Sequence, residues 1–190
     1  SAAINSDALT SLTLQNSGPV TVTSNVARAL DVIAAASTTT GSVTDNTASS
    51  ITFASTGTLA NFSLSGARAA SIDITAGGTV TTGVLTAPLA TALNISGEKV
   101  VTLTGTVDLA AAATTKVTVS GSAGLKAVGG LEATTLTVDA SNTSGVITLG
   151  STVVTAGVGD AATLTTGSGK DVVTLGANTR ATTTGAGDDA

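Results

Sequence analysis

Residues 93–103 read Leu-Asn-Ile-Ser-Gly-Glu-Lys-Val-Val-Thr-Leu. The stretch contains two triplets in which apolar residues flank a polar one, Leu93 to Ile95 and Val101 to Leu103, with a small polar break between them. Alternation of this kind, rich in β-branched side chains, is typical of a strand with one buried face. The stretch therefore predicts two short strands that follow each other closely.

The same triplet recurs along the chain. Many neighbouring triplets start about 8 to 11 residues apart, which is too short for an intervening crossover helix. A sandwich, a barrel and a β-solenoid all have closely spaced short strands, so the spacing alone leaves three architectures open. The other triplets begin at Leu12, Val20, Ile51, Phe62, Ile72, Val117, Leu136, Ile147 and Val173.

The breaks between triplets favour the solenoid. They are clusters of small residues such as Gly77-Gly78 and Gly129-Gly130, whereas the hairpin dipeptides Asn-Gly and Asp-Gly do not occur. We predict an all-β fold, a right-handed parallel β-helix or β-solenoid. Residues 1–156 are expected to form its body, with a candidate break at the Thr-, Ser- and Asn-rich stretch 37–50, and residues 157–190 a separate C-terminal segment.

Composition indicates a narrow core. The chain of 190 residues is 42% hydrophobic with a mean hydropathy of +0.46, which excludes a disordered chain. Yet Phe53 and Phe62 are its only aromatic residues, and a thick globular core would need more of them. Alanine, valine, leucine and isoleucine suit a core filled by one or two small side chains from each strand.

Charge and missing residue types exclude several functions. A net charge of −5 with seven scattered Lys and Arg leaves no basic patch for nucleic acid. Without Cys or His the chain lacks a disulfide framework, cysteine-bound zinc and the usual general base and nucleophile, so we do not expect an enzyme. A carboxylate pair of the glycosidase type stays an alternative. No apolar run approaches the length of a transmembrane segment.

The most specific motif lies near the C-terminus. Residues 166–174 read Thr-Gly-Ser-Gly-Lys-Asp-Val-Val-Thr and fit the nonapeptide G-G-x-G-x-D-x-U-x except at its first position. Residues 184–190, Thr-Gly-Ala-Gly-Asp-Asp-Ala, begin the pattern again. Asp171 and Asp189 are separated by two nonapeptides, which make one full coil, so they are expected to stack on one side. Arg180 occupies the Asp position of the intervening register.

Stacked turns of this kind can bind calcium. Ca²⁺ takes six to eight oxygens at roughly 2.3–2.6 Å, and turn carbonyls and Asp carboxylates supply them. Glycine permits the turn backbone that other residues disfavour. The alternative is that these aspartates only form side-chain hydrogen bonds within turns. The predicted metal residues here are Gly167, Gly169, Asp171, Gly185, Gly187, Asp188 and Asp189.

Weaker oxygen-rich positions lie upstream. Asp160 ends the sequence Gly-Val-Gly-Asp, an out-of-register relative of the same turn, and it joins the candidate metal residues with ordinary turn formation as the alternative. Asp45 and Asp139 each lie near an asparagine between triplets, and both are expected to be turn residues rather than ion ligands.

From residue 93 onward, and most clearly over 166–189, the chain resembles RTX-type bacterial surface-layer proteins, which are exported by type I secretion. The resemblance implies a secreted, cell-surface protein that assembles with copies of itself into a calcium-stabilised lattice. It also implies a secretion signal and further repeats beyond Ala190. Cell-surface polysaccharide or lipopolysaccharide would be bound through another part of a longer chain. The alternative function is an RTX adhesin or biofilm-matrix binding module.

Overall fold

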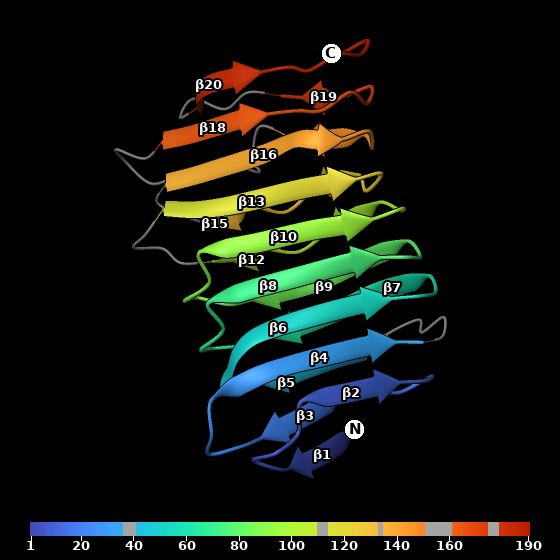
Figure 1. The fold of residues 1–190 in the computed structure, drawn as a ribbon, viewed down its shortest axis with the longest axis vertical. Helices are drawn as coiled ribbons and strands as arrows, with labels where there is room; N and C mark the ends of the chain where they lie inside the picture. Colours follow the sequence, from blue (N-terminus) through green and yellow to red (C-terminus); the bar gives the residue numbers. More distant parts are fainter. Residues whose placement is uncertain (36–40, 110–113, 133–134, 151–160, 175–178) are drawn as a thin grey trace.

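The chain folds as a right-handed β-solenoid. The structure, a computed structural model, describes residues 1–35, 41–109, 114–132, 135–150, 161–174 and 179–190. All strand pairs in it are parallel, and the strands in front in Figure 1 run from left to right as the chain climbs from its N-terminus. This is the hand expected for parallel crossovers. The predicted all-β solenoid is confirmed.

Two sheets face each other across the solenoid. Sheet B holds the even-numbered strands of the first half and their successors: β2 (Ser11–Leu14), β4 (Arg28–Ala34), β6 (Ala48–Ser55), β8 (Ser71–Ala76), β10 (Ala92–Gly97), β13 (Thr114–Gly121), β16 (Thr135–Thr143), β18 (Ala161–Thr165) and β20 (Thr179–Thr183).

Sheet A lies behind sheet B in Figure 1 and is more fragmented. Its main path is β1 (Ala2–Asn5), β3 (Val20–Thr23), β5 (Gly41–Asp45), β7 (Leu59–Ser65), β9 (Val80–Thr86), β11 (Val101–Leu103), β14 (Leu125–Ala127), β17 (Ile147–Leu149) and β19 (Val172–Val173). The second half of β9 pairs with β12 (Val107–Asp108), which pairs with β15 (Leu131–Glu132).

The split in sheet A has a backbone cause. Between β11 and β12 the chain bends at Gly105, and between β14 and β15 it bends at Gly129. A Cβ at Gly105 would overlap the carbonyl oxygen of Gly83, and a Cβ at Gly129 would overlap that of Gly105. Only glycine allows the coils to approach so closely at this corner.

The coil length follows from the register of sheet B. Leu30 pairs with Ile51, Ile51 with Ile72 and Ile72 with Leu93. All four side chains are fully buried. Equivalent positions in this half of the chain are therefore 21 residues apart, as Asp73 and Asn94 also are. Parallel in-register pairing thus places apolar side chains of similar size on top of one another, roughly 4.8 Å apart.

The core is narrow, as the composition predicted. Its members are almost all Leu, Ile, Val and Ala with less than 5% of their surface exposed. The two phenylalanines lie together, Phe53 of β6 against Phe62 of β7, with ring centroids 4.7 Å apart across the two sheets. Small side chains fill the rest of the space between the sheets.

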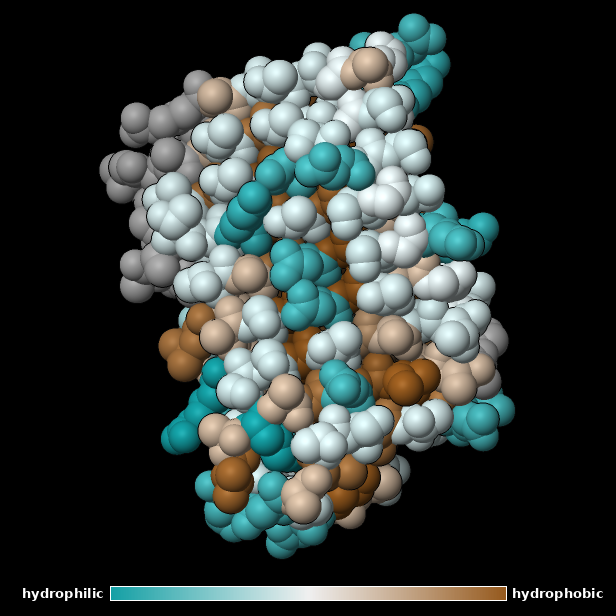
Figure 2. Space-filling view, viewed as in Figure 1, coloured by the Kyte–Doolittle hydropathy of each residue, from teal (hydrophilic) through white to brown (hydrophobic). Residues whose placement is uncertain are grey.

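The outer face of sheet B carries a central column of polar residues. Asn94 donates a hydrogen bond from its amide to the Asp73 carboxylate at 2.7 Å, and Lys116 contacts Asp139 at 2.9 Å. Figure 2 shows hydrophilic side chains in a line along the middle of this face. The column consists of Asp31, Thr52, Asp73, Asn94, Thr118 and Asp139.

No helix is present among the residues that the structure describes, and hence none that is long and apolar enough to cross a membrane.

One charged pair lies inside the solenoid. Arg28 lies two and four residues before Leu30 and Val32 on β4, so its side chain points inward as theirs do. Its guanidinium contacts the Asp45 carboxylate at 2.7 Å. Asp45 is fully buried and also accepts hydrogen bonds from the Thr47 backbone and hydroxyl and from the Ala48 backbone. Asp45 ends strand β5 and caps the following turn, a richer role than the simple turn residue that the sequence predicted.

The pKa of Asp45 reflects this environment. Burial alone raises the pKa of the carboxyl group, but the hydrogen bonds from Thr47 and Arg28 and the charge of Arg28 outweigh it. The pKa therefore lies below its ordinary value of 3.8. Because the folded-state pKa is depressed, the stabilisation is present above the unfolded pKa and is lost as the pH falls through the folded pKa.

We predict that Asp45→Asn lowers the free energy of unfolding at neutral pH by about 3 kcal/mol, because it leaves the Arg28 charge buried without its partner. Below pH 3.8 the stability of the variant should also depend less on pH than that of the wild type, because the variant has no Asp45 carboxylate to protonate. Urea unfolding at a series of pH values measures both effects. The control is Asp31→Asn, exposed on β4, with an expected change within about 0.5 kcal/mol. Equal stabilities of the two variants at neutral pH would contradict the assignment.

Candidate metal centre

The candidate site lies where three successive turns lead from sheet B to sheet A. They are residues 143–147 between β16 and β17, residues 167–171 between β18 and β19, and residues 185–189 after β20. The Ser168 N–H donates to the Thr143 carbonyl at 3.0 Å, which ties the second turn to the first. The Gly185 N–H donates to the Thr166 hydroxyl at 3.2 Å, which ties the third to the second.

Glycine is required in this stack because the turns touch through their backbones. A Cβ at Gly167 would overlap the carbonyl oxygen of Thr143, and a Cβ at Gly185 would overlap that of Gly167. Gly169 lies against the carbonyl of Gly145 in the same way, and Gly187 against that of Gly169. The glycines of the two copies of the nonapeptide motif therefore lie in register, one directly over the other.

The aspartates of the motif are stacked as their separation by two nonapeptides predicted. The Asp189 carboxylate accepts a hydrogen bond from the Asp171 backbone N–H at 3.1 Å. In the same way, the Asp171 carboxylate accepts one from the Ile147 backbone N–H at 2.8 Å. Each carboxylate thus binds the coil before its own. This contact fixes one oxygen, Oδ1, of each aspartate.

The second oxygen of Asp171 has no such partner. Asp171 is fully buried, and its Oδ2 accepts no hydrogen bond from any residue that the structure describes. Buried polar atoms are nearly always paired, and an ionised carboxylate left partly unpaired in the interior is costly. The orphaned oxygen therefore marks a position where a positive ligand would be strongly stabilised.

Further backbone oxygens of the same turns have no hydrogen-bond donor among the described residues. Within the described ranges, the carbonyls of Gly145, Gly167 and Gly169 accept no hydrogen bond. Together with Asp171 and Asp189 they form a donor set of neutral carbonyls and carboxylates. Hard cations such as Ca²⁺ prefer oxygen ligands, and the chemical type of these oxygens suits such an ion. In the part of the chain that is described, no three acidic side chains converge on one point, so backbone oxygens would have to complete the shell.

The other predicted metal residues differ in exposure. Asp189 is half-buried and Asp188 exposed, so Asp188 lies on the solvent side of the last turn. Asp160 lies outside the described residues. Arg180, expected to replace an aspartate on the opposite side, belongs to β20 in sheet B.

Sequence reasoning missed the turn that precedes the motif. Thr143 is buried, and its hydroxyl donates to the Ala123 carbonyl at 2.6 Å and accepts from the Gly145 N–H at 2.9 Å. One hydroxyl thus satisfies a carbonyl and an N–H between two coils. Because Thr is common throughout the sequence, no local pattern singles out Thr143.

Comparison with protein-family models, with curated proteins and with solved structures found no match to this chain.

We predict that Gly167→Ala lowers the free energy of unfolding by about 1–3 kcal/mol, because the new methyl group forces the stacked turns apart. Urea unfolding and amide hydrogen exchange of residues 167–171 measure the effect. Gly18→Ala is the matched control, since the nearest atom to a Cβ there is the Ser1 nitrogen at 4.0 Å. If both variants unfold at the same urea concentration, the close approach of the backbones at Gly167 does not contribute to stability.

Proposed function

We propose that this chain is a structural β-solenoid segment of a self-assembling bacterial surface-layer subunit, and that calcium stabilises its C-terminal coils. The observation that carries the calcium part is the buried, unpaired Oδ2 of Asp171 within a stack of glycine turns. The lattice part rests on the resemblance over residues 93–189 and on the regular outer surface.

Calcium would act on folding in this proposal. Bringing glycine turns together costs conformational entropy, and placing the Asp171 carboxylate in the interior adds a desolvation cost. A bound Ca²⁺ would offset both by binding the Asp171 and Asp189 carboxylates and the nearby carbonyls. Because the unfolded chain does not hold these oxygens together, the binding free energy would become folding free energy.

The described acidic side chains support a structural role. Asp45, Asp73 and Asp139 each accept a hydrogen bond or contact a cation of the protein itself. Asp7 caps the turn after β3 by accepting hydrogen bonds from the Ser24 hydroxyl and the Asn25 N–H. These carboxylates hold coils together, so their charges and hydrogen-bond acceptors are already occupied within the fold.

The outer face of sheet B supports assembly with further copies. Exposed hydroxyl side chains such as Thr52, Thr75 and Thr163 stand on a sheet whose rows repeat at the strand spacing. Short side chains lose little entropy when a surface packs against them. A regular face of this kind could make the same contact many times, which a lattice requires.

We predict that Ca²⁺ raises the thermal unfolding temperature of the wild-type chain and that Asp171→Asn abolishes the rise. Asparagine keeps the oxygen that accepts the Ile147 N–H but removes the negative charge. At a calcium concentration of 100 times Kd the wild type should gain about 2.7 kcal/mol. In EDTA the variant should be at least as stable as the wild type, because it removes an unpaired buried charge.

Asp31→Asn is the matched control, since it removes one exposed carboxylate from β4 and should leave the calcium response unchanged. Mg²⁺ at the same concentration should give a smaller shift, because it demands tighter octahedral geometry. A wild-type unfolding temperature that is the same in Ca²⁺ and in EDTA would overturn the calcium proposal.

Assembly is tested by negative-stain electron microscopy of the purified chain with Ca²⁺ and with EDTA. Ordered two-dimensional sheets are expected with Ca²⁺, and single particles with EDTA. Thr52→Lys should prevent the sheets without changing the unfolding temperature, because a long charged side chain would stand on the packing face. Monomers that stay dispersed in Ca²⁺ but attach to cells would favour the adhesin function instead.

A further inference from the structure

Two buried threonines hold the three turns of the candidate metal centre, and one of them stands where the nonapeptide motif has glycine. Thr166 occupies the first position of the motif at residues 166–174 and is 3% exposed. Thr143 ends β16, one coil earlier, and is also 3% exposed. A hydroxyl buried in an apolar solenoid needs hydrogen-bond partners, and both threonines have theirs in the glycine turns.

Thr143 fixes the first of these turns. Its hydroxyl accepts the Gly145 N–H at 2.9 Å and donates to the Ala123 carbonyl at 2.6 Å. The Ser144 N–H donates to the Gly121 carbonyl at 3.0 Å, which adds a second bond to the preceding coil. Gly145 is thus held at its N–H, while its carbonyl oxygen has no donor among the described residues.

Thr166 fixes the third turn. Its hydroxyl accepts the Gly185 N–H at 3.2 Å, and its own N–H donates to the Thr183 carbonyl at 2.9 Å. Both bonds join the coil of β18 to the coil of β20. A glycine at position 166, as in the motif, would have no side chain to accept the Gly185 N–H. The departure from the motif therefore supplies a bond between coils that the motif itself lacks.

The turns that these threonines hold bring oxygens together at two equivalent places. A Cβ at Gly169 would lie 2.5 Å from the Gly145 carbonyl oxygen and 3.1 Å from Oδ1 of Asp171. A Cβ at Gly187 would overlap the Gly169 carbonyl oxygen and lie 3.1 Å from Oδ1 of Asp189. In each case a carbonyl of one coil and a carboxylate of the next border the same glycine. The unpaired, buried Oδ2 of Asp171 belongs to the first of these places.

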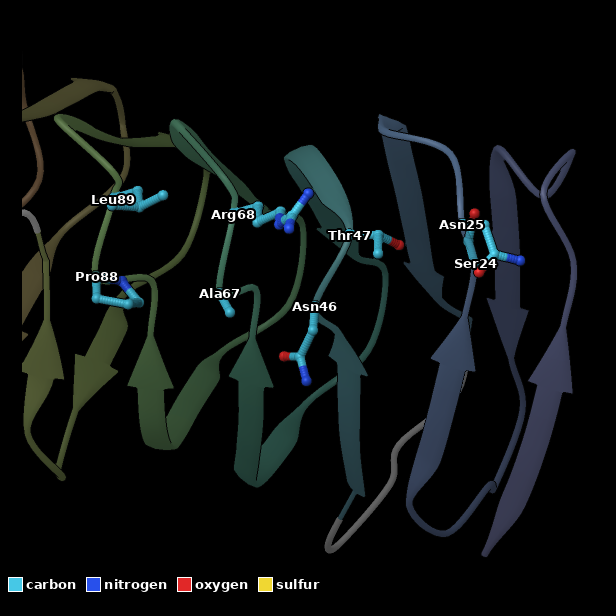
Figure 3. Close-up of a pocket in the computed structure, with 8 residues that line it drawn as sticks. All are labelled: Ser24, Asn25, Asn46, Thr47, Ala67, Arg68, Pro88 and Leu89. Atoms are coloured by element: carbon cyan, nitrogen blue, oxygen red, sulfur yellow. The ribbon is translucent and has the colours of Figure 1, made fainter.

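The opposite edge of the solenoid is built without such oxygens. Figure 3 shows Asn46, Arg68 and Leu89 on successive turns there, in an open pocket lined by side chains. The residues that line this pocket include one cation and no carboxylate. A divalent cation would find no ligand of opposite charge among them. A calcium titration therefore reports on the glycine turns and not on this pocket.

We propose that the hydroxyls of Thr143 and Thr166 are positioning groups of the calcium site. Neither hydroxyl binds the ion. Each holds the N–H of a glycine, Gly145 or Gly185, and so fixes a turn whose oxygens border the ion before the ion arrives, which lowers the entropic cost of binding. Thr143 lies outside both copies of the motif, so the site extends one coil upstream of the motif. The inference rests on the proposed calcium function and adds to it two residues outside the ligand set.

The test is isothermal titration calorimetry of the 190-residue chain with Ca²⁺, using paired substitutions at each threonine. Valine keeps the size of the side chain and removes the hydroxyl, whereas serine keeps the hydroxyl and removes the methyl group. Thr143→Val and Thr166→Val should each raise the Kd for Ca²⁺ about tenfold, as loss of a group that orients a metal ligand does. Thr143→Ser and Thr166→Ser should bind nearly as the wild type does. A role in packing alone would give the opposite order, because serine leaves the larger cavity.

Thr82→Val is the matched control. Thr82 lies on β9, several coils before the metal residues, and is 4% exposed. Its hydroxyl donates to the Thr102 carbonyl of the next coil. The control variant should lower the free energy of unfolding in EDTA and leave the Kd for Ca²⁺ unchanged.

Amide hydrogen exchange of the wild type adds a measurement that needs no variant. Ca²⁺ should slow exchange of the Gly145 and Gly185 N–H groups and not that of the Gly77 N–H, which donates to the Ser55 carbonyl far from the site. Equal exchange of Gly145 and Gly185 with and without bound Ca²⁺ would contradict the inference.

The two proposals fail in different ways. A wild-type chain that binds no Ca²⁺ overturns the calcium function and this inference with it. A wild type that binds Ca²⁺ with the same Kd as Thr143→Val and Thr166→Val overturns the positioning role alone.

Discussion

The parallel hydrogen-bond register between coils is the constraint on which the whole structure depends. Strands of successive coils pair in parallel, so within the regular stretches each residue lies directly over its counterpart at about 4.8 Å, and single bulges such as the one between Thr118 and Ser120 interrupt the register. The column of Leu30, Ile51, Ile72 and Leu93 must then be apolar along its whole length, and the adjacent column from Asp31 to Asp139 must tolerate solvent. A slip of one residue would exchange the two columns, so the register is strongly specified.

The same constraint explains the unusual composition. Two sheets that face each other closely leave room for one layer of side chains from each strand, and Ala, Val, Leu and Ile fill it. The largest side chains in this core are the two phenylalanines, and Phe53 and Phe62 pack directly against each other with ring centroids 4.7 Å apart. The pair of Arg28 and Asp45 is the exception that this core accepts, because each charge is bonded by the other and by neighbouring turns. Removing one partner of such a pair is costly because it leaves the other charge buried without a partner.

Much of the fold could be predicted from the sequence, because each triplet shows which side chains of a strand point inward and which point outward. The stack of Asp171 over Asp189 was predictable too, since both lie in one motif at one spacing. The burial of Asp45 could not be predicted in this way, because an aspartate followed by Asn46 is typical of an ordinary exposed turn. The sequence did contain one indication: Arg28 lies two residues before Leu30 on the same strand, so its side chain points inward and needs a buried partner. The alignment of Asn46, Arg68 and Leu89 along one edge was not predictable for another reason. The residues that line this edge come from four successive coils, and the irregular breaks between triplets conceal the coil length that brings them together.

The two edges of the solenoid are built differently. On the edge from sheet B to sheet A, glycines such as Gly167 and Gly185 bring backbones into contact, and the Asp171 carboxylate of one of these turns is buried. That edge presents backbone oxygens, the ligand type on which the calcium proposal depends. On the opposite edge the turns carry side chains outward, Arg68 among them. A packed apolar core separates the two edges. The same stacking of coils thus brings backbone atoms together on one edge and aligns outward side chains on the other (Figure 3).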